Sequence, residues 1–144
     1  MIRRKAREYT LQMLFQYDFT GSRTAHGPAG EADDLSGSEG ESVLSFAQEL
    51  FRGTIEHLDA IDQAIQSAAR HWQIERMAAV DRNIMRCAVY ELLFRKDIPP
   101  AVTINEALEI AKKYSSQESV SFINGLLDTI FRETGRNATS AGGA

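Results

Sequence analysis

Three histidines and one cysteine, side chains that can bind metals or act as nucleophiles, are scattered along this chain of 144 residues. His26, His57 and His71 lie far apart, and none has a cysteine or a paired acid at the spacing of metal ligands. The single cysteine, Cys87, cannot form an internal disulfide, and its apolar neighbours indicate a small buried residue rather than a nucleophile. We therefore expect no metal site and a reducing compartment.

Three carboxylates, Glu91, Glu106 and Glu109, could in principle act as a general acid and a general base. In helical proteins, however, such residues serve in ion pairs and helix caps far more often. The sequence also contains no phosphate-binding loop, dinucleotide-binding fingerprint or nucleophile elbow. We expect a binding protein without catalytic residues or a cofactor, rather than an enzyme.

A cluster of cations begins the chain and comprises Arg3, Arg4, Lys5 and Arg7. They fall at the start of a predicted helix, where each cation opposes the helix macrodipole by about 0.3–1 kcal/mol. This placement indicates a role outside folding, such as neutralising the phosphates of a nucleic acid, and a solvated helix terminus is the alternative. Because the formal net charge is −4, the cluster would form a small basic patch on an acidic protein.

A second mixed surface is predicted near the start of the last helix, at Lys112, Lys113, Gln117, Glu118 and Phe122. It combines charge, hydrogen-bonding groups and an aromatic ring, the mixture that binds single-stranded RNA through phosphates, base edges and stacking. For Phe122, packing in the core is the alternative.

The basic cluster and the mixed surface must be positioned by a central helix. Residues 80–94, VDRNIMRCAVYELLF, are apolar on most faces of a helix and should be enclosed by other helices. The one polar strip of this helix is Asn83, Arg86 and Tyr90, at the spacing that keeps side chains on one face. The strip predicts either a seam in which Arg86 forms a salt bridge to a neighbouring helix or a contact with a partner.

Helical periodicity recurs on both sides of the central segment, and no run has the two-residue period of a strand. We expect helices over residues 3–19, from 42 to about 53, from 55 to 69, from 103 to 114 and from about 116 to 130. The paired prolines at 99 and 100 should separate the central helix from the next, which Thr103 would cap. Gly125 is expected at a close helix contact, and Trp72 in packing rather than recognition.

The pattern predicts an all-α fold, a compact bundle of about six or seven helices around a central buried helix. We expect a single domain over residues 1–134, with a mobile, acidic, glycine- and serine-rich loop at about 21–41 and a disordered tail at 135–144. No leader peptide or run long enough to span a bilayer is apparent, which favours a cytoplasmic protein and not a membrane protein.

Several linked segments are distinctive: RKARE and LQMLF at 4–8 and 11–15, VDRNIMR at 80–86, DIP at 97–99, INEA at 104–107, AKKY at 111–114 and FINGLLD at 122–128. Together they resemble the NusB transcription antitermination factor family. The resemblance implies an all-helical, non-catalytic RNA-binding protein. It would pair with NusE, a ribosomal small-subunit protein, and recognise the boxA element of nascent RNA. The complex would join RNA polymerase and promote read-through of terminators, chiefly on ribosomal RNA operons.

By matching position, the resemblance implies one set of RNA-binding residues and one set that faces NusE. Together with Arg3 of the same basic cluster, the RNA-binding set is Arg4, Lys5, Arg7, Gln12, Lys112, Lys113, Glu118 and Phe122. The NusE-facing set is Phe15, Asp81 and Arg86, which favours the partner interpretation of the polar strip. Ser115 stands where relatives often carry a glycine, which predicts a strained or reshaped turn before the last helix.

Two further possibilities stay open from the sequence. The chain could be a helical protein–protein interaction module without an RNA function of its own, its basic terminus being incidental. It could also form a homodimer, through the surface that NusE would otherwise use.

Overall fold

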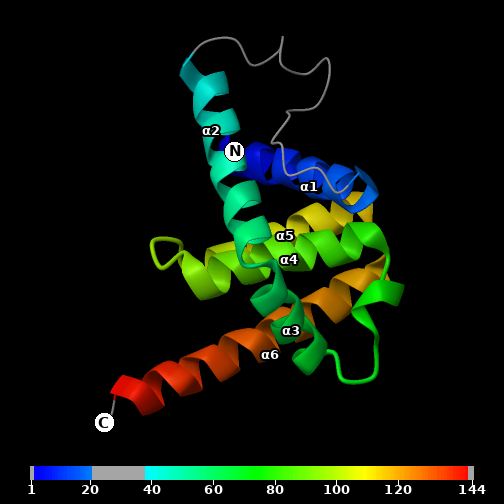
Figure 1. Ribbon diagram of the computed structural model, residues 1–144, viewed down its shortest axis with the longest axis vertical. Helices are drawn as coiled ribbons and strands as arrows, with labels where there is room; N and C mark the ends of the chain where they lie inside the picture. The colour runs from blue at the N-terminus through cyan, green and yellow to red at the C-terminus, as the bar shows by residue number, and fades with distance from the viewer. Residues whose placement is uncertain (1, 21–37, 143–144) are drawn as a thin grey trace.

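The computed structural model describes the backbone of residues 2–20 and 38–142, and the side chains of residues 3–20 and 40–134 (Figure 1). The described part is helical, without a strand. In chain order its elements are α1 (Ile2–Thr20), α2 (Ser38–Glu56), α3 (Leu58–Ala68), the short 3-10 helix η2 (Ile74–Arg76), α4 (Ala79–Phe94), α5 (Pro100–Tyr114) and α6 (Gln117–Gly142). The predicted all-α class is confirmed.

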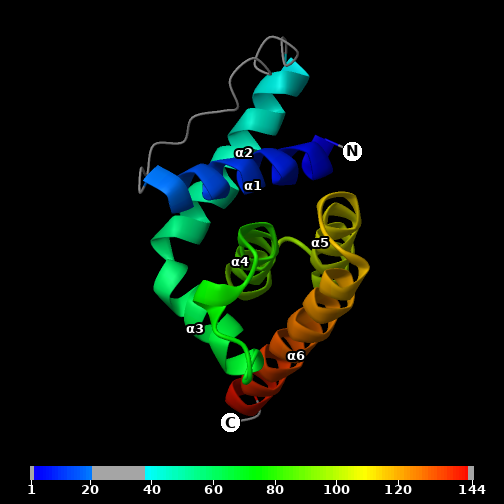
Figure 2. The ribbon, with the colours of Figure 1, turned by 90° about the vertical axis from the view of Figure 1, so that its right-hand side faces the viewer.

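Helix α4 is the centre of the fold, as its sequence predicts. Every residue from Asn83 to Leu92 is buried, and α4 contacts α1, α2, α3, α5 and α6. Figure 2 shows α4 nearly end-on, with α1 and α2 above it and the other helices around it. A helix that is apolar on most faces gains most from this position, because each face removes apolar surface from water.

Helices α1 and α5 run in the same direction across the bundle. Arg4 pairs with Glu106 near their N-terminal ends, and Glu8 pairs with Lys113 further along. Helix α6 returns from the end of α5, so the α5–α6 turn lies beside the first turn of α4. This arrangement brings the predicted sites of α1, α5 and α6 toward one side of the molecule.

Two helix starts differ from the sequence prediction. Helix α2 begins at Ser38, so the last residues of the predicted loop at 21–41 are helical, and residues 21–37 lie outside the described part. An acidic residue such as Glu41 is favourable near a helix N-terminus, which is consistent with the earlier start. Helix α5 begins at Pro100, since proline suits the first helical position, and Thr103 is therefore an interior residue rather than a cap.

Two glycines differ from expectation in opposite senses. Helix α2 does not end at about residue 53, as predicted, but continues to Glu56. Gly53 lies inside the helix against the ring of Tyr90, and an added Cβ would lie 2.1 Å from a ring carbon. Gly125 is exposed, and apart from the neighbouring turns of its own helix no atom lies within 4 Å of where its Cβ would be. Gly53, and not Gly125, is the position of close helix packing.

Helix α6 continues to Gly142, and the disorder expected for residues 135–144 stays a prediction. No proline follows Pro100, and extending an existing helix adds one hydrogen bond for each residue that is fixed. None of the described helices has the length and hydropathy needed to cross a membrane.

Candidate nucleic-acid interface

The seam between α1 and α5 carries a row of cations whose side chains reach solvent. Arg4 donates from Nε to Glu106 at 2.5 Å, and this hydrogen bond holds the pKa of Glu106 below its usual value. Lys113 donates to Glu8 at 3.0 Å and remains 59% exposed. Each cation is only partly neutralised, because a solvated ion pair at the surface is weak and can exchange its carboxylate for a phosphate.

The remaining residues of this row are exposed. Arg3 places its guanidinium 4.8 Å from the centre of the Phe46 ring. Lys112 pairs with Glu109 at 3.2 Å and is 60% exposed. Lys5 and Gln12 are exposed on α1. The structure therefore places these predicted RNA-binding residues on accessible surface: Arg3, Arg4, Lys5, Gln12, Lys112 and Lys113.

Arg7 does not belong to this surface, and its prediction as an RNA contact is corrected. The residue is 4% exposed and donates from Nε and Nη2 to the two carboxylate oxygens of Glu91, at 2.9 and 2.7 Å. Thr103 donates to Glu91 as well, at 2.9 Å. Arg7 lies four residues before Leu11 on the inward face of α1, so the helical period directs it into the core.

The three carboxylates considered as acid and base form ion pairs, as the sequence predicts: Glu91 with Arg7, Glu106 with Arg4 and Glu109 with Lys112. Cys87 is a buried free thiol, and burial raises its pKa, so its interpretation as a small core residue is confirmed. Among the described residues, no group of three His, Cys, Asp or Glu side chains could hold a metal ion.

Arg86 forms salt bridges between helices, which was one of the two interpretations of the polar strip on α4. Its Nε and Nη2 donate to Asp62 of α3 at 2.8 and 2.9 Å, and its Nη1 donates to Asp18 of α1 at 3.0 Å. Asp18 also accepts from Asn83 at 2.8 Å and from Arg82 at 3.1 Å. At 8% exposure, Arg86 ties α1, α3 and α4 together instead of presenting its guanidinium to a partner.

Asp81 joins the start of α4 to the α5–α6 turn. One carboxylate oxygen accepts from the hydroxyl of Ser115, and the other accepts from Ser119 at 2.6 Å. Ser115 has extended backbone angles, with φ −133° and ψ −177°, so the predicted strain is absent and no glycine is needed there. The Ser116 hydroxyl accepts from the amide of Ser119 at 3.1 Å and thereby caps α6.

Two other predicted residues lie beside this turn. Glu118 is exposed, whereas Phe122 is half-buried with its ring edge-on to Trp72, at 6.2 Å between ring centres. These side chains line an open depression of about 280 Å³ together with Arg76, Met77 and Asp81. Trp72 is 62% exposed, so its prediction as a packing residue is wrong for most of its surface.

Phe15 lies in an open groove of about 370 Å³ between α1, the start of α4 and the end of α5, a groove that Glu8 and Gln12 of α1 also line. Tyr114 lines the groove and is 47% exposed. Phe19, which is 78% exposed, lies 5.3 Å from Phe15 between ring centres. The sequence analysis did not select Tyr114 or Phe19, although each is an aromatic residue at the end of its helix beside polar neighbours.

Comparisons with known proteins were made against family models, curated sequences and solved structures. The model of the NusB family matches residues 4–132. The Transcription antitermination protein NusB of Thermodesulfovibrio yellowstonii is 46% identical over 92% of this chain and 93% of its own. The protein of the same name from Desulfitobacterium hafniense is 50% identical over 90% and 88%.

Solved structures agree with this match. The T. maritima NusB structure has a TM-score of 0.73 and 36% identity over 91% of each chain. A structure of the antitermination factors NusB and NusE in complex with dsRNA has a TM-score of 0.71 over 92% of this chain and 97% of the matched chain. At 24% identity, that complex shows a shared fold.

Proposed function

This chain belongs to the NusB family, and we propose that it is a transcription antitermination factor that binds boxA RNA together with NusE. The relatives bear the name of transcription antitermination proteins, and a structure of the same fold is described as a complex with NusE and RNA. In this role the chain is a cytoplasmic binding protein without catalysis, and its complex joins RNA polymerase on ribosomal RNA operons.

The observation that carries the proposal is the row of accessible cations along α1 and α5 on a chain whose net charge is negative. It leads from Arg3 and Arg4 at one end to Lys112 and Lys113 at the α5–α6 turn, where Glu118 and Phe122 follow. Cations along such a row neutralise successive phosphates, while the aromatic and polar groups at its end meet bases. Gln12 is the hydrogen-bonding member of the row on α1.

The structure supports a revised set of residues for NusE. Phe15 is the direct contact, in the groove that it shares with Tyr114. Asp81 and Arg86 act as positioning residues, because their side chains hold the α5–α6 turn and helices α1 and α3 against α4. A second copy of the chain is the other candidate occupant of this apolar groove, which would give a homodimer in place of the complex.

The test is fluorescence anisotropy with labelled boxA RNA and a scrambled RNA, titrated with the protein alone and with NusE at two salt concentrations. We expect NusE to raise the affinity for boxA but not for the scrambled RNA. Substituting Lys112→Ala should weaken boxA binding and flatten its salt dependence by about 0.7 in the log–log slope, the value for one single-strand phosphate contact.

The matched control is Arg132→Ala on α6. Arg132 is 69% exposed and pairs with Asp128 four residues earlier, much as Lys112 pairs with Glu109 three residues earlier. This variant should leave the RNA affinity unchanged. If neither RNA is bound with or without NusE, the chain is better described as a protein–protein interaction module.

A further inference from the structure

The exposed indole of Trp72 lies next to the proposed RNA-binding residues but was assigned no function. Its ring plane is tilted by 66° from that of Phe122, an edge-to-face contact that supports the indole at one side. Burial of a large aromatic side chain normally stabilises a fold, whereas 62% of this residue is left in solvent. An exposed aromatic side chain of this kind offers a surface on which a base can stack.

The segment that carries Trp72 is held in place by side chains from two helices. Gln66 of α3 donates to the carbonyl oxygen of Trp72 at 2.6 Å and to that of Ala69 at 3.3 Å, and it accepts from the amide of Ile74 at 3.0 Å. Arg82 of α4 donates to the carbonyl oxygens of Ile74 and Met77, both at 3.3 Å. The backbone is therefore fixed while the indole remains exposed, so little ordering is required when a ligand binds.

The charges around the indole are mixed: the depression beside it carries the carboxylates of Asp81 and Glu118, and two arginines that can meet phosphates flank the ring. Arg70 and Arg76 flank Trp72 in the sequence RHWQIER, both are exposed, and neither forms an ion pair within the part of the chain that the structure describes. The depression beside the ring is lined by Ser116 and Ser119, whose hydroxyl protons are donated to Ser119 and to Asp81, so these oxygens can only accept a hydrogen bond from a base. A basic protein segment would be repelled by these two arginines, whereas a nucleic-acid strand would be attracted.

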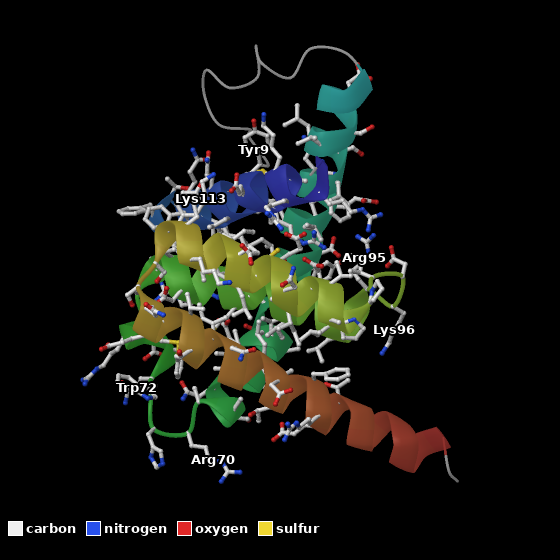
Figure 3. The ribbon with its side chains drawn as sticks, turned by 180° about the vertical axis from the view of Figure 1, so that it is seen from behind. Tyr9, Arg70, Trp72, Arg95, Lys96 and Lys113 are labelled. Carbon is white, nitrogen blue, oxygen red and sulfur yellow. The ribbon has the colours of Figure 1, made fainter. Side chains whose placement is uncertain are left out.

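The position also continues the proposed RNA path. Figure 3 shows Trp72 and Lys113 on the same side of the molecule, with the start of α6 between them, while Arg95 and Lys96 lie on the opposite side. A strand that follows Lys112 and Lys113 past the α5–α6 turn reaches Phe122 and then Trp72.

We propose that Trp72 is a stacking platform for one unpaired base of a single-stranded RNA, with Arg70 and Arg76 neutralising the phosphates on either side. This inference rests on the proposed RNA-binding function and adds to it a base subsite. The surface of the α3–α4 joint thereby becomes part of the interface, and Gln66 becomes its positioning residue.

Trp72 is the only tryptophan of the chain, so its intrinsic fluorescence reports on this subsite alone. We expect boxA RNA to quench the fluorescence, with a midpoint equal to that of the anisotropy titration. Where NusE is added, the Trp72→Phe variant serves as the blank, because it removes this chain's tryptophan signal. Trp72→Phe keeps a ring and should bind within a few-fold of wild type, whereas Trp72→Ala should lose roughly 5- to 100-fold in affinity.

The matched control is Phe131→Ala, because Phe131 is an aromatic residue of α6 that is 41% exposed. It lies nine residues beyond Phe122, which places it on the opposite face of the helix. This variant should bind RNA as wild type does, and thermal unfolding of each variant shows that the fold is kept.

The outcomes separate the two proposals. If wild type binds RNA but its fluorescence is unchanged and Trp72→Ala binds equally well, the base subsite is wrong and the RNA-binding function stands. If wild type binds no RNA under any condition, both proposals fail. If Trp72→Ala loses only NusE binding, the surface docks a protein, and the subsite is again rejected.

Discussion

Arg7 of α1 and Glu91 of α4 form a two-point ion pair in the interior of the bundle, with nitrogen–oxygen distances of 2.9 and 2.7 Å. Their side chains are 4% and 1% exposed. A third hydrogen bond reaches Glu91 from Thr103 of α5, so three helices meet at one carboxylate. Arg7 Nη1 has no protein partner and is buried beside a cavity of about 20 Å³, a volume that fits one water molecule.

The first prediction follows from this pair. Arg7→Ala leaves the Glu91 carboxylate buried and uncompensated, so we expect a loss of about 3–5 kcal/mol in the free energy of unfolding, measured by urea denaturation. RNA affinity per folded molecule should not change. Replacing the pair by Arg7→Met with Glu91→Leu should recover much of the stability. A stable Arg7→Ala protein with weakened, less salt-dependent RNA binding would restore Arg7 to the RNA interface.

The sequence identified the cations of α1 correctly but did not separate their roles. Arg3, Arg4 and Lys5 reach solvent, while Arg7 falls on the buried face with Leu11, and the helical period alone could have shown this. Its partner could not be found in this way, because Glu91 lies 84 residues further along the chain. Pairing between distant helices depends on packing that no local pattern contains.

The central helix was predictable because its apolar residues leave it no stable position on a surface. The function of its polar strip was not. A buried arginine indicates either a salt bridge or an interface, and only the positions of Asp18 and Asp62 decide between them. Trp72 was misjudged for a related reason, since composition gives no measure of exposure outside a periodic run.

The second prediction concerns Arg86. Arg86→Ala removes four hydrogen bonds at 2.8–3.2 Å and leaves Asp18 and Asp62 without their main cation. We expect the free energy of unfolding to fall by several kcal/mol. The upper limit is the loss that follows when one partner of a buried ion pair is removed, about 3–5 kcal/mol. Lys112→Ala is the control, because an exposed pair contributes only about 0–1 kcal/mol. Loss of NusE binding without loss of stability would instead identify Arg86 as a partner contact.

The third prediction is a specific acid sensitivity. Burial alone would raise the pKa of Asp18, but hydrogen bonds from Asn83, Arg82 and Arg86 outweigh burial and hold the pKa below its ordinary value of 3.8. The stabilisation from this carboxylate is therefore complete above pH 3.8 and is lost as the pH falls through the lower folded-state pKa. Asp18→Asn should be less stable than wild type at pH 7, and the difference should shrink near pH 2 in urea unfolding. A difference that stays constant between these pH values would exclude the ionised carboxylate as the source of the stability.

The last prediction contrasts the two glycines within helices. Gly53→Ala places a methyl group 2.1 Å from a carbon of the Tyr90 ring, so either the ring or the helices α2 and α4 must shift. We expect a loss of about 1–3 kcal/mol, the usual cost of overpacking, in thermal or urea unfolding. Tyr90→Phe should not relieve the clash, because the nearest ring carbon remains, whereas Tyr90→Ala should relieve it at the cost of a cavity.

Gly125→Ala is the matched control, since it makes the same change in a helix where the new methyl group meets no atom within 4 Å apart from the neighbouring turns of that helix. Alanine is favoured over glycine inside a helix by about 1 kcal/mol, so this variant should be more stable than wild type by up to that amount. The two substitutions thus have opposite signs because of their neighbours and not because of helix propensity. If both variants were stabilised, the close contact between α2 and Tyr90 would not exist in solution.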